Sequence, residues 1–193
     1  MGEVEGQIRS ERLDAERELR RRAALAQIRQ YPDPVLRMEA KQVEDFDDVL
    51  TGLVERMTTL MQEARGVGLA APQAGVLRRV FVYQTSDEDP VTVLVNPRIT
   101  STSEERESAE EGCLSLGAAS VVAPVERPVS LTLEAVTPSG EPVTVEADGL
   151  EARVIQHELD HLDGVLIIDR TTPEHRREAL AKLRLQPVLA PLR

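Results

Sequence analysis

Apolar residues recur at two different spacings along this chain, and each spacing predicts a different kind of element. Between about residue 46 and Ala64 they recur every three to four positions, which predicts an amphipathic helix. Asp45 or Asp47 can cap the start of this helix, and Gly66 is placed to end it. The apolar face of this helix is expected to pack on the core.

Beyond this helix the spacing of apolar residues falls towards two, which predicts strands. Short strands are expected at 80–83 and 91–95, with polar turns between them. The run from Val129 to Val136 alternates clearly. A turn at Pro138-Ser139-Gly140 separates it from a second apolar run at 143–145, so these segments predict a β-hairpin.

Two more helices follow. One is expected from about Leu150 to Asp163, where Gly164 stops it, and a short one from Pro173 to about Leu185. Strands between helices predict an α+β fold. We expect antiparallel β-sheets packed around the central helix at 150–163, with an N-terminal and a C-terminal helix in addition.

The first 22 residues are almost entirely charged or small. Glu18 precedes Arg22 by one helical turn, a spacing that favours an exposed helix. We therefore expect a charged extension at 1–22, helical or frayed, followed by a single catalytic domain at 23–193. The sequence leaves open whether the extension is inert or docks on a partner.

Composition narrows the class of protein. Apolar residues make up 41% of the chain, enough for a core. The net charge of −11 and an aromatic content of 2% argue against nucleic-acid binding as the main function. The N-terminus has no signal-peptide pattern, no stretch is apolar enough to span a membrane, and Cys113 has no partner for an internal disulfide. These features favour a cytoplasmic protein.

The segment with the clearest chemistry is Gln156-His157-Glu158-Leu159-Asp160-His161. On a helix, His157 and His161 lie one turn apart on one face, so both imidazoles can bind one cation. Glu158 lies beside them. This is the H-E-x-x-H pattern of metallohydrolases, in which the carboxylate acts as general base. The alternative is a helix that carries two surface histidines by chance.

A catalytic metal site needs a third protein ligand. No histidine stands near Ile167, where an extended metalloprotease pattern would place one. His175, Glu174 and Glu178 lie downstream, and nothing marks them as ligands. Cys113 is the stronger candidate, because a thiolate binds zinc or ferrous iron well, although a lone cysteine is usually only a small buried apolar residue.

Three blocks, in this order and at about these separations, resemble those of the peptide deformylases. They are Gly66-Val67-Gly68-Leu69-Ala70-Ala71-Pro72-Gln73, Glu111-Gly112-Cys113-Leu114-Ser115, and the segment from Gln156 to Gly164. The likeness covers the chain from about residue 25 to the end of the third helix. It implies removal of the formyl group from the initiator methionine of nascent polypeptides, with release of formate.

The resemblance also implies a role for each site residue. Cys113, His157 and His161 would hold one divalent ion, Fe²⁺ in the cell, with zinc, nickel or cobalt in isolated protein. The ion lowers the pKa of its bound water, and the resulting hydroxide attacks the formyl carbon while Glu158 moves the protons. The metal, the side-chain amide of Gln73 and the backbone N–H of Leu114 would stabilise the charge on the formyl oxygen.

The glycines Gly66 and Gly68 would let an extended peptide approach the backbone closely. The resemblance implies that Val67, Leu150 and Val154 line the pocket for the methionine side chain.

Two further features bear on this resemblance. Glu111 and Arg127 correspond to a structural ion pair behind the cysteine loop. The family usually has a proline and an arginine after Ser115, but Leu116–Ala123 contains neither. This loop, at 116–126, is expected to alter substrate affinity and sequence preference.

Three functions remain open from the sequence. The first is deformylation of formylmethionyl nascent peptides, with or without contact to the ribosome near its exit tunnel. The second is a metallopeptidase that uses the same helix and a ligand downstream of His161. The third is a noncatalytic relative that binds metal or the ribosome, against which an intact Glu158 and Gln73 argue.

Overall fold

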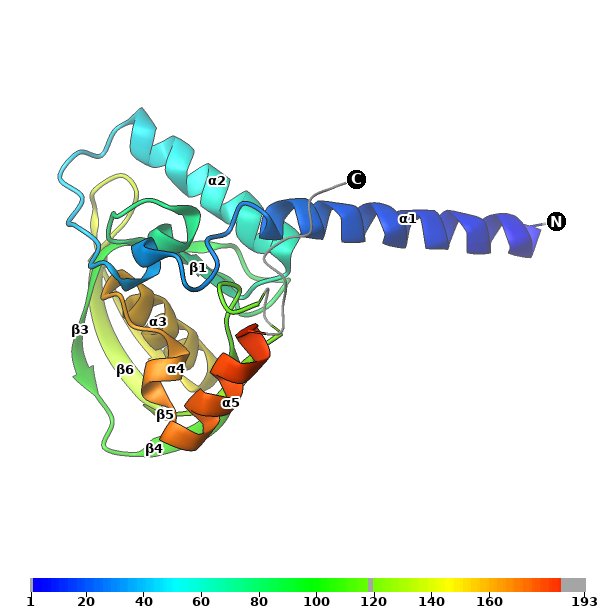
Figure 1. Ribbon diagram of the computed structural model, residues 1–193. Helices are drawn as coiled ribbons and strands as arrows, with labels where there is room; N and C mark the ends of the chain where they lie inside the picture. Colours follow the sequence, from blue (N-terminus) through cyan, green and yellow to red (C-terminus); the bar gives the residue numbers. More distant parts are fainter. Residues whose placement is uncertain (1, 118–119, 185–193) are drawn as a thin grey trace.

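The computed structural model describes residues 2–117 and 120–184 of the chain (Figure 1). The helices are α1 (Gly2–Leu25), α2 (Asp48–Ala64), α3 (Gly149–Leu162), α4 (Ile167–Arg170) and α5 (Pro173–Arg184), with short 3-10 helices at Pro34–Arg37 and Ala71–Ala74. The strands are β1 (Gly68–Ala70), β2 (Val80–Tyr83), β3 (Thr92–Thr102), β4 (Arg106–Gly112), β5 (Val122–Pro128), β6 (Ser130–Val136) and β7 (Pro142–Asp148).

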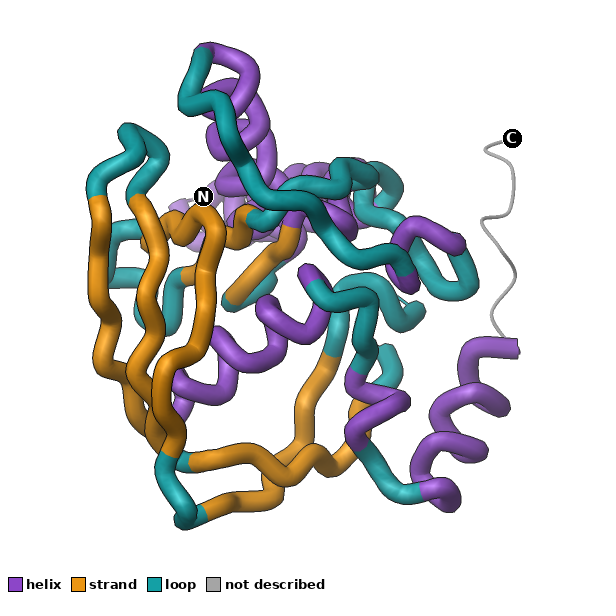
Figure 2. The backbone as a smooth tube through the Cα atoms, turned by 90° about the vertical axis from the view of Figure 1, so that its left-hand side faces the viewer, coloured by secondary structure: helices purple, strands orange, loops and turns teal. Residues whose placement is uncertain are grey.

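The strands form two antiparallel sheets. One has five strands in the order β1-β2-β3-β6-β7, and the other is a ribbon of β4 and β5. Helix α3 lies between them, packed against β1, β2, β6 and β7 on one side and against β5 on the other (Figure 2). The predicted α+β fold with antiparallel sheets around a central helix is thereby confirmed.

Strand β2 shows how the period-two pattern divides the core. Phe81 and Tyr83 pack into a buried cluster with the apolar side of α3, whereas Val80 and Val82 pack with α2. All four side chains are buried, because helices cover both faces of this part of the sheet. The sheet therefore holds α3 and α2 on opposite faces.

Helix α2 starts as predicted, because the Asp47 carboxylate accepts a hydrogen bond from the Leu50 N–H at 3.0 Å. Its end differs from the prediction. Arg65, not Gly66, adopts the left-handed conformation, with φ of 59°. Gly66 is required for space instead, since a Cβ atom there would lie 2.7 Å from Leu114 Cδ1.

The predicted hairpin is confirmed as β6 and β7. Helix α3 ends at Leu162, and Gly164, predicted to stop it, follows two residues later with φ of +70°. The end predicted for the last helix, Leu185, lies outside the described residues. Strands β1, β4 and β5 were missed, and β5 occupies part of the segment 116–126 that we interpreted as a loop. Strand β4 is exposed at most positions, so it shows no apolar alternation that could predict it.

Helix α1 projects away from the rest of the protein (Figure 1), and its C-terminal part packs against α2. Ala24 at this end is fully buried. The predicted pair forms, with Arg22 Nε donating to Glu18 Oε1 at 3.2 Å. Within the described residues, no helix is long and apolar enough to cross a membrane.

Asp169, in α4, pairs with Arg37, the last residue of the 3-10 helix at Pro34–Arg37 from far earlier in the sequence, and with Arg176 of α5. Burial alone would raise the pKa of Asp169, but hydrogen bonds from Arg37 and from the Leu166 N–H outweigh it, so its pKa lies below the usual value. The ionised form therefore stabilises the fold above the ordinary carboxyl pKa, and this contribution is lost as the pH falls through the lowered value. Asp169→Asn should lower the free energy of unfolding by about 1–2 kcal/mol at pH 7. Urea titrations should show a smaller difference from wild type at pH 3, whereas an equal difference at both pH values would contradict the assignment.

Candidate active site

Three metal-binding side chains converge between the ribbon and α3. Cys113 follows β4, and His157 and His161 lie one turn apart on α3. One ligand atom from each falls within 4.8 Å of the others, and Cys113 Sγ lies 3.3 Å from His161 Nε2. The structure thus brings together the three predicted ligands. His175 lies apart from them, exposed and hydrogen-bonded to Thr172.

The donor set fits a divalent cation. Ligands at 2.0–2.3 Å from a tetrahedral ion lie about 3.3–3.8 Å from one another, which agrees with the distance between Cys113 and His161. His157 Nδ1 is 3.0 Å from the Glu111 carboxylate, an arrangement that orients metal-binding histidines in proteins. Burial lowers the pKa of His161 well below its usual value, so its imidazole is neutral, as a ligand must be.

The charges around His157 also favour a cation. Burial opposes protonation of His157, but hydrogen bonds with Cys113 and Glu111 outweigh it and raise its pKa to about 10. The groups around this ring therefore stabilise a positive charge between them. A bound divalent cation would supply that charge directly.

Glu158 is buried beside this cluster, and within the described residues its Oε2 atom has no hydrogen-bond partner. Burial raises the pKa of Glu158 to about 7, against the opposing charges of His157 and Arg127. A Cβ atom at Gly68 would clash with Glu158 Oε1. Glycine at this position therefore leaves room for a carboxylate that can exchange a proton near neutral pH.

Gln73 is held with its amide nitrogen towards the cysteine. Its Oε1 accepts from the Ala70 N–H at 2.8 Å, and its Nε2 donates to Ser115 Oγ at 3.1 Å and lies 3.8 Å from Cys113 Sγ. Because the oxygen is engaged by the backbone, the amide cannot flip without losing these bonds. Gln73 therefore presents a fixed N–H donor beside the candidate metal ligands.

A buried ionic network supports the site. Arg127 donates to both oxygens of Glu111, at 2.6 and 2.9 Å, as expected for the predicted pair. Sequence reasoning missed that Arg127 also binds Asp160, at 2.9 Å, and that Arg153 binds Glu111, at 2.8 Å. Burial would raise the pKa of Glu111, but hydrogen bonds from Arg127 and His157 bring it down to about 2. Glu111 therefore stays ionised and orients His157.

A cavity of about 290 Å³ opens onto Glu158, His157 and Cys113. All five residues predicted to bind the substrate line it: Gly66, Val67, Gly68, Leu150 and Val154. Val67 and Leu150 are 50% and 56% exposed, so their apolar side chains are available to a ligand. Three charged lining residues were not predicted: Arg65, Glu110 and Arg153.

Comparison with known proteins agrees with this arrangement. Residues 25–177 match the family model described as polypeptide deformylase. The chain is 46% identical over 155 residues to a peptide deformylase from Natranaerobius thermophilus, covering 80% of this chain and 97% of the relative. It is 47% identical over 161 residues to one from Acidothermus cellulolyticus, covering 83% and 87%.

Solved structures give the same result. A crystal structure of a peptide deformylase from Legionella pneumophila superposes with a TM-score of 0.77 at 40% identity, covering 81% of this chain and 92% of that one. One from Thermotoga maritima superposes with a TM-score of 0.72 at 44% identity, covering 76% and 97%. The chain therefore belongs to the polypeptide deformylase family and is an enzyme of that family.

Proposed function

We propose that this enzyme removes the formyl group from the N-terminal methionine of newly made polypeptides. The observation that carries the proposal is the convergence of Cys113, His157 and His161 beside Glu158 and Gln73, next to a cavity whose lining includes the apolar side chains of Val67, Leu150 and Val154. We place the reaction in the cytoplasm, on nascent chains that leave the ribosome. We retain the division into an extension at 1–22 and a catalytic domain at 23–193.

Cys113, His157 and His161 would hold the divalent cation that the family implies, and we propose Fe²⁺ as the ion used in the cell. When bound, such a cation lowers the pKa of water and polarises a carbonyl oxygen. A cysteine with two histidines also accepts zinc, nickel or cobalt.

The protein's own residues then position the formyl group and move protons. Glu158 takes a proton from the attacking water as its oxygen joins the formyl carbon. The Gln73 amide and the Leu114 backbone N–H donate to the formyl oxygen as negative charge develops there. When the carbon–nitrogen bond breaks, Glu158 returns the proton to the leaving amine, and formate is the other product.

The substrate would bind as an additional strand. β1 is an edge strand of the five-stranded sheet, and an extended peptide can pair with such an edge. The methionine side chain would lie in the pocket of Val67, Leu150 and Val154. Backbone pairing is independent of side chains, so the sequence after the methionine can vary.

The Gln73→Ala variant should lower kcat about 10²–10³-fold, because one donor to the developing oxyanion is lost. Iron content should remain that of wild type, because Gln73 is not among the proposed ligands. Gln27→Ala, which removes an exposed amide that does not line the cavity, is the matched control and should leave kcat unchanged. A Gln73→Ala enzyme with the kcat of wild type would exclude this role.

One assay tests the proposed function. The protein is purified without oxygen, loaded with iron, and given formyl-Met-Ala-Ser while formate and peptide fragments are both measured. Formate without internal cleavage is the expected result, and Cys113→Ser should reduce the iron bound per chain. Absence of formate from the iron-loaded protein would reject the proposal, and internal cleavage would indicate a peptidase.

A further inference from the structure

A second hollow, of about 250 Å³, adjoins the catalytic cavity. It is lined by Arg17 and Arg20 of α1, by Gln62 and Glu63 at the end of α2, and by Arg65. Arg65 also lines the catalytic cavity, so the two hollows share this side chain as a common wall. The family match begins at residue 25, so the arginines of α1 lie outside the residues matched to the family model.

The backbone beside Glu158 gives the direction in which a bound peptide would run. Gly68 lies against Glu158, and Arg65, three residues earlier, lines both the catalytic cavity and the second hollow, so the chain from Gly68 back to Arg65 leads from the reacting end to that hollow. A peptide paired with this edge, its formyl group at Glu158, therefore extends towards Arg65. At about 3.3 Å per residue, its third or fourth residue reaches Arg65 and the next two or three reach Arg17 and Arg20.

The lining of the second hollow is basic, in a protein whose net charge is −11. Three guanidinium groups face one carboxylate, that of Glu63. Arg17, Arg20 and Arg65 are all exposed, and Arg17 pairs with Asp14 only at the outer limit of an ion pair, 4.0 Å. Guanidinium groups bind carboxylates with paired hydrogen bonds as well as charge.

We propose that Arg65, Arg17 and Arg20 form a downstream subsite that binds acidic side chains at about the fourth to sixth residues of the substrate. This inference rests on the proposed function, since it assumes that the peptide's formylated end lies at Glu158. It assigns a role in substrate selection to the helix that precedes the family domain.

The test compares two sets of peptides with the full-length, iron-loaded protein. Formyl-Met-Ala-Ser followed by three glutamates or by three lysines gives the ratio of kcat/KM. The same peptides without the formyl group, labelled at the C-terminus, give the ratio of dissociation constants by fluorescence anisotropy. We expect the acidic peptide to be favoured about fivefold to tenfold at low ionic strength, and less in 0.5 M salt, because exposed ion pairs are weak and screened.

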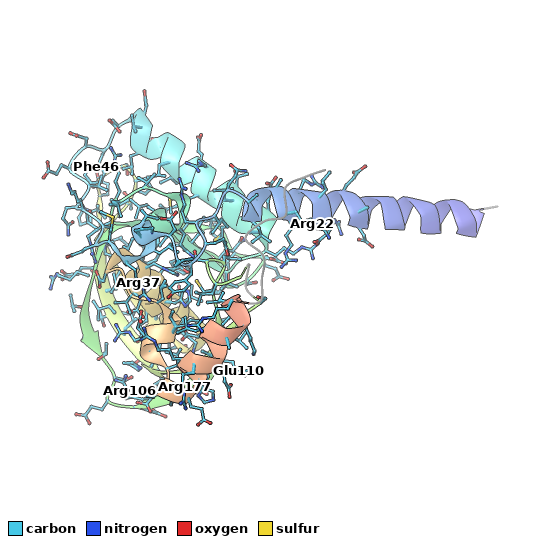
Figure 3. All side chains as sticks on the ribbon, viewed as in Figure 1. Arg22, Arg37, Phe46, Arg106, Glu110 and Arg177 are labelled. Atoms are coloured by element: carbon cyan, nitrogen blue, oxygen red, sulfur yellow. The ribbon has the colours of Figure 1, made fainter. Side chains whose placement is uncertain are left out.

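The double variant Arg17→Gln/Arg20→Gln should bring the acidic-to-basic preference, in kcat/KM and in binding, close to one. Arg65→Gln should also lower this preference, although the sequence of α1 is unchanged. Circular dichroism checks that the helix is retained. The matched control is Arg106→Gln/Arg177→Gln, which removes the same charge at the end of the molecule away from α1 (Figure 3). Figure 3 also marks Arg22, on α1 where it meets the body of the protein.

Each outcome decides the matter. If the wild-type protein has the same kcat/KM and the same dissociation constant for the acidic and basic peptides, the subsite is rejected. An equal loss of preference in the control variant would also reject it, because that loss would reflect only overall charge. If formate is not released but the acidic peptide without formyl still binds better, the subsite stands and the proposed function fails. If formate is released with no acidic preference, the subsite alone fails.

Discussion

Replacing Glu158 with glutamine should lower kcat for formyl-Met-Ala-Ser by about 10²–10⁴-fold, the usual contribution of a general acid–base group. Glutamine has nearly the same shape and fits the space left by Gly68, but it cannot accept a proton from water or return one to the amine. KM should change little, because Glu158 acts on the reacting atoms and the peptide is held by the sheet edge and the pocket. Initial rates of formate release at saturating peptide measure the effect.

Iron content must be measured on the same Glu158→Gln samples, since loss of metal would also abolish activity. Glu146→Gln, an exposed carboxylate on β7, is the matched control and should have the kcat of wild type. If Glu158→Gln retains both iron and full activity, Glu158 is not the proton carrier and the proposed mechanism is wrong.

The Arg127→Ala variant should lower the free energy of unfolding by about 3–5 kcal/mol, as expected when one member of a buried ion network is removed. The side chains of Arg127 and Glu111 are each 5% exposed, so the carboxylate left behind is poorly hydrated. Asp160 keeps its bonds to Arg170, at 2.6 and 3.2 Å, and Glu111 keeps Arg153, which places the loss towards the lower end of that range.

Urea denaturation at pH 7 measures the loss in Arg127→Ala. The matched control is Arg98→Ala, because Arg98 pairs with Glu134 at 2.6 Å but these side chains are 71% and 55% exposed. Removal of an exposed pair should cost less than about 1 kcal/mol. Similar losses in the two variants would show that burial does not set the strength of the Glu111–Arg127 contact.

The elements that could be predicted from the sequence are those whose two sides differ in environment. Helix α2 and the hairpin of β6 and β7 each have one apolar side, so their periods are visible in the sequence. Strand β4 has the reverse pattern, because its one buried side chain is the charged Glu111. That residue is stabilised inside the protein by Arg127, which comes from another strand, so no local pattern indicates it.

The residues of the candidate site also differ in whether a local sequence pattern could predict them. The spacing of His157 and His161 follows from the helix itself, so the proximity of their imidazoles could be predicted from the five residues 157–161. Cys113 and Gln73 come from distant segments. Thiolate chemistry made Cys113 a candidate third ligand, but only the resemblance to a family assigned a role to Gln73. Asp160 lies on α3 like an ordinary surface charge, and its burial depends on tertiary packing that no periodicity reveals. The hollow between α1 and Arg65 depends on the angle between two helices, which is likewise not encoded in any local pattern.

The separation of the two sheets has a consequence for how the enzyme accommodates its substrate. Among the described strands, no ladder joins the ribbon of β4 and β5 to the five-stranded sheet. Backbone hydrogen bonds connect the two sheets at one corner, where the Ser103 N–H donates to the Ser130 carbonyl at 3.0 Å. The other end of the ribbon carries Gly112, next to Cys113. The ribbon is therefore held to the rest of the enzyme mainly by side chains, most of them involving α3. Arg153 bonds the carbonyls of Glu107 and Val125, and it is helped by the Arg127–Asp160 pair and by the bond from Gln156 to the Pro128 carbonyl. The width of the cleft therefore depends on several side-chain contacts between the ribbon and α3.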